Sequence, residues 1–314
     1  MKKTNLIAIL ALAATPAFLH AAESFSDVVG YQKTDFPTGS SLQGVGFINP
    51  DLIAATATKL SASSISVPGL SSAANSLAPS GGLPTHYVEI TSGSHEGILA
   101  DILSNNGTTV VLDADISSFN STETIAIRKH VKISDVFKNS TGLGDYQDSL
   151  SVYQLDGSAS VFLRDSSTTT GWLDASSFNE SDAVLYPSQG CVLVSATGGS
   201  FTFTGTVKKT KTVIPLNAGA VNIVSLGNPS SGNFNIGNIN LGAGLVDYSD
   251  SVSVFSTNGA LTQDYTLLWA GAADGFLDAS TFSPVSGVTV PGTSGFVVSV
   301  MADTAWTVAA PYTP

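Results

Sequence analysis

The fold is decided by DYQDSLSVY at residues 145–153, because a close copy of it, DYSDSVSVF, stands at residues 247–255. In both stretches apolar residues alternate with serine, the period-two pattern of a β-strand that buries one face. Two further segments repeat in the same order: GWLDASSF at 171–178 with GFLDASTF at 275–282, and GCVLVS at 190–195 with GFVVSV at 295–300. This repetition predicts an all-β protein built from two tandem copies of a sandwich-like or barrel-like β unit.

The repeat also has an earlier half, and this half fixes the domain boundaries. TDFP at 34–37 leads to Asn49-Pro50, and TVIP at 212–215 leads to Asn228-Pro229. The first copy is much longer than the second, so it must contain an insertion. The predicted organisation is a signal peptide (1–22), a first copy in two pieces (23–52 and 129–207), an inserted module (53–128) and a second copy (208–314).

The inserted module has its own β pattern. Short strands are predicted at 53–58, 63–67, 87–90, 98–103, 108–112 and 124–128. Asn106-Gly107 is a hairpin signal, because these two residue types readily adopt positive φ. Short strands joined by tight turns predict a small SH3-like β-barrel, with a sandwich lobe as the alternative. In the repeated units, 173–178 and 277–282 are each predicted to form one helical turn.

The N-terminal residues are typical of a bacterial export signal. Lys2 and Lys3 precede an apolar run that starts at Leu6, and Ala21-Ala22 supplies small residues for cleavage. No later segment has the roughly 18 consecutive apolar residues of a membrane helix. The mature chain is therefore expected in the periplasm, on the outer surface or outside the cell, without a transmembrane helix.

Composition excludes several classes of protein. The net charge of -12 disfavours binding to nucleic acid, which requires a basic surface. A hydrophobic share of 43% with only 11% charged residues excludes a disordered acidic tail. The single cysteine, Cys191, excludes a disulfide framework and any cysteine-rich metal site. Because Cys191 lies in an apolar run, it is expected to be a small buried hydrophobic residue.

Three blocks carry a family resemblance. They are SDVVGY at 26–31, the spaced set Tyr87, Ser92, Gly93, Glu96 and Gly97, and the stretch 145–178 with its second copy from Asp247. In these blocks the chain resembles a large, uncharacterised family of secreted repeat proteins from verrucomicrobial bacteria. The chain departs from that family in having Leu-Asp-Ala-Ser where a Trp-Arg-type strand is expected. The resemblance implies the architecture and an envelope or extracellular setting. It implies no site, because the family has no established activity.

Candidate metal ligands are few. Asp145, Asp148, Asp247 and Asp250 recur in both copies and are candidate Ca²⁺ ligands, since this ion prefers carboxylate oxygens. They lack the dense Asp-x-Asp-x-Asp-Gly spacing of a calcium loop. The favoured interpretation is that they accept backbone N–H groups in turns. The histidines of the mature chain (His86, His95 and His130) lack His-Glu-x-x-His spacing and are expected in exposed loops.

Aromatic residues are the other candidates for binding. Trp172 aligns with Phe276 and Trp306 with Phe201, and such interchange between aromatics is typical of a core. Trp269 has no evident counterpart in the first copy, which makes it the candidate exposed ring for carbohydrate contact. No Gly-x-Ser-x-Gly nucleophile elbow is present.

The sequence thus predicts a function without catalysis. The leading hypothesis is a structural or adhesive protein of the bacterial surface or matrix, which associates with itself or with other envelope components. One alternative is an extracellular carbohydrate-binding protein that recognises polysaccharide. The other is a hydrolase with an acidic site of unusual type. No cofactor other than Ca²⁺ is suggested.

Overall fold

The computed structural model describes residues 29–119, 121, 123–154, 158–227, 233–235, 241–242, 244–285 and 287–310. The predicted signal peptide lies outside these residues. Of the described residues, 49% lie in strands and 2% in helix, so the all-β prediction is confirmed. Within the described part of the chain, no helix is long and apolar enough to span a bilayer.

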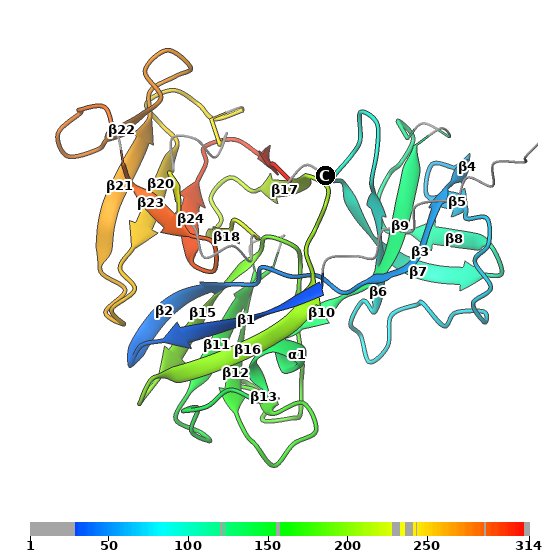
Figure 1. Ribbon diagram of the computed structural model, residues 1–314, viewed down its shortest axis with the longest axis horizontal. Helices are drawn as coiled ribbons and strands as arrows, with labels where there is room; N and C mark the ends of the chain where they lie inside the picture. The colour runs from blue at the N-terminus through cyan, green and yellow to red at the C-terminus, as the bar shows by residue number, and fades with distance from the viewer. Residues whose placement is uncertain are drawn as a thin grey trace, which may run out of the picture.

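The strands form three lobes, which Figure 1 shows around a common centre. The first lobe contains a five-stranded sheet in the order β13-β12-β11-β15-β2 and two strand pairs, β1-β16 and β10-β14. Its elements are β1 (Val29–Phe36), β2 (Gly39–Gly44), β10 (Val131–Lys132), α1 (Ile133–Phe137), β11 (Ser149–Tyr153), β12 (Ala159–Arg164), β13 (Trp172–Asp174), β14 (Val184–Leu185), β15 (Gly190–Ser195) and β16 (Gly199–Thr206).

The second lobe has the same strand order. Its five-stranded sheet runs β22-β21-β20-β24-β18, and its pairs are β17-β25 and β19-β23. Its strands are β17 (Thr212–Leu216), β18 (Asn222–Ser225), β19 (Asn233–Asn235), β20 (Ser251–Phe255), β21 (Gln263–Trp269), β22 (Phe276–Asp278), β23 (Thr289–Pro291), β24 (Gly295–Ser299) and β25 (Thr304–Val308). When β22, β21, β20, β24 and β18 are matched in this order with β13, β12, β11, β15 and β2, each strand has the same neighbours in its sheet. The exact domain boundaries stay a prediction.

One ladder differs in register between the two lobes. Phe201 pairs with Thr34 in the first lobe, whereas its aligned residue Trp306 pairs with Ile214 in the second. The sequence alignment instead matches Thr34 with Thr212. The two ladders are therefore offset by two residues, and an offset of two keeps the same side chains on the buried face.

The third lobe is a seven-stranded sheet formed by the region in which the inserted module is predicted. The strand order is β3-β9-β6-β7-β8-β5-β4. Its two edge strands, β3 and β4, are consecutive in the chain and joined by the fully buried Ala57. The predicted small SH3-like barrel stays a prediction. Its strands are β3 (Asp51–Thr56), β4 (Thr58–Ser61), β5 (Ser64–Ser66), β6 (His86–Ile90), β7 (Leu99–Asn106), β8 (Thr109–Leu112) and β9 (Thr124–Lys129).

Each lobe has its own hydrophobic core. The aromatic residues that interchange between copies are buried, with Trp172 and Trp306 at 0% and 1% exposure. Cys191 is buried in the first core, and its counterpart Phe296 is buried in the second. Burial raises the pKa of the Cys191 thiol to about 12, as expected for a residue that only packs.

The first and second lobes exchange matching hydrogen bonds. Gly44 donates its N–H to the Thr293 carbonyl at 2.7 Å, and Ser225 donates to the Ser188 carbonyl at 2.7 Å. Gly44 pairs with Gly190 on one ladder, and Ser225 pairs with Gly295 on the other, so the two donors occupy equivalent positions. The contact between the lobes is thus locally two-fold symmetric.

A buried ion cluster attaches the third lobe to the segment that links the other two. Glu89 on β6 is fully buried and lies 2.6 Å from Lys208 Nζ and 2.9 Å from Arg128 Nε. Thr210 Oγ1 also donates to Glu89. The two cations offset the desolvation of the carboxylate, so its pKa is lowered despite burial.

Candidate functional site

Each repeated lobe presents a phenylalanine on an exposed turn. Phe178 follows β13 and Phe282 follows β22, and the two residues are 61% and 63% exposed. Both have positive φ, 55° and 54°, a region that bulky residues rarely adopt. The cost of this conformation is on the order of 1 kcal/mol or more per residue. Two large apolar side chains are therefore held in water by an unfavourable backbone, at equivalent places.

An aspartate builds each of these turns. Asp174 Oδ1 accepts the N–H groups of Ser176 and Ser177 at 3.1 and 2.8 Å, and the Phe178 N–H reaches the Asp174 carbonyl at 2.8 Å. This is one helical turn, as predicted for 173–178. The hydroxyl of Ser176, followed by that of Ser177, lowers the pKa of Asp174 to about 2.

The second lobe repeats this arrangement at Asp278. Asp278 Oδ1 accepts the N–H groups of Ser280 and Thr281 at 2.8 and 3.0 Å. The Phe282 N–H reaches the Asp278 carbonyl at 2.7 Å, which closes the helical turn predicted for 277–282. The Ser280 hydroxyl is the main cause of a lowered pKa at Asp278.

An exposed tyrosine also repeats, on the loop before β11 in the first lobe and on the loop before β20 in the second. Tyr146 and Tyr248 have φ of 57° and 55° and are 61% and 57% exposed. Their N–H groups bind the carbonyls of Arg164 and Trp269, at the ends of β12 and β21. We call Phe178 and Tyr146, with Phe282 and Tyr248, the aromatic turns.

The first tyrosine is also held by its hydroxyl. Tyr146 donates this group to Asp165 Oδ2 at 2.6 Å, and the bond raises the pKa of the phenol. The pKa of Asp165 is lowered, chiefly by the Ser167 hydroxyl and then by Tyr146. The Tyr146 ring thus has a fixed direction while it stays exposed.

Three of the four candidate calcium ligands accept hydrogen bonds from the turns, as the favoured interpretation of the sequence expects. Asp148 and Asp250 are fully buried, and each accepts two backbone N–H groups. Asp145 accepts the N–H and the hydroxyl of Ser166. Asp247 lies beside Gly271, which stands where the first lobe has Ser166. The described residues contain no group of three or more His, Cys, Asp or Glu side chains that could hold a metal ion.

Trp269, the candidate carbohydrate contact, is partly buried against the second core. Its ring lies edge to face with Phe276 at 5.1 Å and covers Gly242, where a Cβ atom would overlap the indole. Trp269 also has a counterpart, which sequence comparison missed. It occupies the ladder position of Arg164, whose guanidinium lies 5.7 Å from the ring centre of Trp172. The Trp269 ring is thus largely covered, and its role in carbohydrate contact stays a prediction.

The histidine prediction is wrong for His86, which is partly buried on strand β6, and for His130. The His130 side chain is fully buried, with ring centres 4.7 Å from Tyr87 and 5.0 Å from Tyr186. His95 is partly buried beside Glu123, at 3.0 Å. The sequence could not indicate this burial, because Tyr87 and Tyr186 are far from His130 in the chain and come close to it only in the fold.

We compared the chain with protein-family models, curated proteins and solved structures. No family model matched, and neither of the other two comparisons gave a match.

Proposed function

We propose that the mature chain is an exported, non-enzymatic structural or adhesive protein of the bacterial surface or matrix, and that its aromatic turns make the contacts. The observation that carries this proposal is the match between Phe178 and Phe282 in backbone angle, exposure and aspartate cap. A chain that folded alone would be more stable with these rings buried or absent. Their exposure at two equivalent positions is typical of a surface that binds something.

The two turns make the proposed contact bivalent. Burying one phenylalanine ring contributes about 1.5–3 kcal/mol, which is weak for a single contact. Two such rings on one chain reinforce each other when both are engaged. They also allow one chain to bind two neighbours, which leads to a filament or layer rather than a closed dimer. The fixed turn geometry lowers the entropy lost on binding.

The test is microscopy of assembled protein with matched variants. Negative-stain images of residues 23–314 are expected to show filaments or layers. The double variant Phe178→Asn/Phe282→Asn is expected to remain dispersed, because asparagine tolerates positive φ and keeps the turn. Leu60→Asn is the control, since Leu60 is 54% exposed but belongs to the third lobe. Assembly by the double variant equal to that of wild type would refute the role of the turns.

Binding to polysaccharide is the second candidate, favoured by Tyr146. An exposed ring fixed by a carboxylate, with Asp145 adjacent, offers both stacking and hydrogen bonding to a sugar. A glycan array separates the two proposals. Polysaccharide binding predicts signals that Tyr146→Ala/Tyr248→Ala abolishes, with Trp269→Ala as a comparison. If the array gives no signal and the protein visibly assembles, polysaccharide binding is excluded and only the structural proposal remains.

A further inference from the structure

A cavity of about 360 Å³ lies where the three lobes meet. Its wall takes Leu99 and Asp101 from the third lobe, Tyr186 from the first, and Ile214 and Ile223 from the second. This volume is within the roughly 300–1,000 Å³ of sites that hold small molecules. Junctions between domains are a common place for such sites. The aromatic turns take no part in it.

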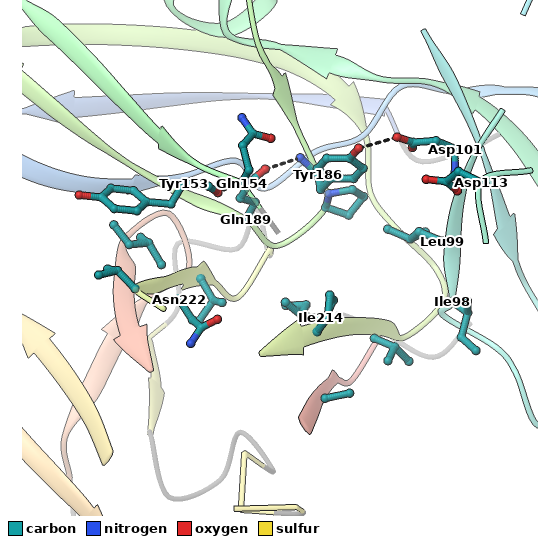
Figure 2. A pocket seen from close by; sticks show the side chains of 17 residues that line it. Ile98, Leu99, Asp101, Asp113, Tyr153, Gln154, Tyr186, Gln189, Ile214 and Asn222 are labelled. Atoms are coloured by element: carbon teal, nitrogen blue, oxygen red, sulfur yellow. Dashed lines mark hydrogen bonds between the residues drawn. The ribbon is translucent and has the colours of Figure 1, made fainter. Parts of the chain in front are cut away.

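The polar groups of the cavity gather at one end. In Figure 2, Asp101 and Asp113 lie next to each other and the Tyr186 hydroxyl points toward them, while Asn222 lies across the cavity. Tyr186 donates to Asp101 Oδ2 at 2.6 Å. His130 Nε2 lies 2.8 Å from Asp101 Oδ1, so both oxygens of this carboxylate are held in place. Asp101 is thus oriented by two residues of the chain before any ligand arrives.

Asp113 is an exposed residue of the cavity wall. Its Oδ1 accepts the backbone N–H of Asp101 at 2.8 Å. Partial desolvation, and after it the Asp101 carboxylate, raises the pKa of Asp113. The described lining includes no lysine or arginine. Beside this end lies the imidazole of His130, which pairs with Asp101, and two carboxylates against one imidazole leave this end with negative charge.

The remainder of the wall is mainly apolar. Ile98 and Leu99 line the cavity from the third lobe, and Val213, Ile214 and Ile223 line it from the second. Val221, 46% exposed, lies near the opening. The side-chain amide of Asn222 already donates hydrogen bonds within the protein, to the carbonyls of Asn217 and Val298. An occupant would thus meet carboxylates at one end and hydrocarbon along its length.

We propose that this cavity binds a small amphipathic amine, with its ammonium group between Asp101 and Asp113 and its apolar body between Leu99 and Ile223. The charge of the polar end selects a cation over an alcohol or an acid of the same length. An ammonium group donates three hydrogen bonds, enough to engage Asp113 Oδ2 together with an Asp101 oxygen. The apolar wall selects against short hydrophilic amines. The occupant contacts all three lobes and so stabilises their arrangement.

Calorimetry with three probes of one chain length tests this proposal. Residues 23–314 are titrated with n-octylamine, n-octanol and n-octanoate at neutral pH. Binding of the amine alone is the expected result, accompanied by a rise in the melting temperature. Equal binding of amine and alcohol, or no binding of the amine at millimolar concentration, would overturn the proposal.

Two aspartate variants locate the ammonium group. Asp113→Asn keeps the acceptor for the Asp101 N–H, so the fold is retained and affinity for the amine is expected to fall by roughly tenfold or more. Asp115→Asn is the matched control, because Asp115 is exposed two residues away and caps Ser117 outside the cavity wall. Unchanged affinity in Asp113→Asn, or equal losses in both variants, would contradict the assignment. Assembly through the aromatic turns is independent of either result.

Discussion

Asp148 and Asp250 make the same two backbone hydrogen bonds in the two repeated lobes. Asp148 accepts the N–H groups of Gly144 and Ala196, both at 2.7 Å. Asp250 accepts those of Val246 and Met301, at 2.7 and 2.8 Å. In each lobe one carboxylate thus ties the loop before the central strand to the end of the neighbouring strand. The same loop positions the exposed tyrosine.

Replacing Asp148 with alanine is expected to destabilise the first lobe strongly. The substitution leaves two N–H groups without their acceptor, at a cost of about 2–4 kcal/mol in the free energy of unfolding. Urea denaturation followed by circular dichroism measures the effect. Asp145→Ala is the control, because Asp145 is exposed and its loss should change stability by less than about 1 kcal/mol. Similar losses in both variants would show that Asp148 does not have this role.

Gly190→Ala is expected to weaken the contact between the first and second lobes. A Cβ atom at Gly190 would lie 2.7 Å from Ile223 Cγ2 of the second lobe. Such overpacking costs about 1–3 kcal/mol. Thermal unfolding should show a lower melting temperature for Gly190→Ala than for Gly144→Ala, where the nearest atom would be 3.5 Å away. Equal melting temperatures would mean that the lobes are less closely packed than described.

The Asp174 carboxyl is expected to titrate near pH 2 in the folded protein. Its pKa is lowered from 3.8 by the hydroxyls of Ser176 and Ser177. A lowered pKa in the folded state stabilises the turn above pH 3.8, and this contribution is lost as the pH falls toward 2. Carbon-detected NMR titration measures the pKa directly. Ser176→Ala should move it upward, and an unchanged value would exclude that hydroxyl as the main cause.

Cys191 is expected to resist thiol reagents until the first lobe unfolds. Its thiol is buried, and its pKa of about 12 leaves almost no thiolate at neutral pH. Labelling with a chromogenic disulfide should be slow in buffer and fast in concentrated urea. Rapid labelling of the folded protein would place Cys191 at the surface.

Local patterns predicted much of the fold, because the interactions concerned are local in sequence. The alternation in 149–153 specified β11, and the aspartate and serines of 173–178 specified the helical turn. The burial of His130 could not be predicted, since it depends on Tyr87 and Tyr186, which are distant in the chain. The central cavity was missed for the same reason, because three lobes supply its wall.

Aromatic exposure was harder to predict than aromatic burial. Repetition identified the buried rings correctly, because a core accepts one aromatic in place of another. It also selected Trp269 as the exposed ring, although a glycine backbone and Phe276 cover it. Phe178 resembles a core residue in sequence but is exposed, at a position with left-handed backbone. Positive φ at a non-glycine residue has no reliable sequence signal.

Sedimentation velocity tests most directly whether the aromatic turns drive association. Residues 23–314 should sediment as growing oligomers with rising concentration, and Phe178→Asn/Phe282→Asn should sediment as a monomer throughout. Each single variant should stop at small oligomers, because one contact remains. A wild-type chain that stays monomeric at the highest concentration would contradict the claim.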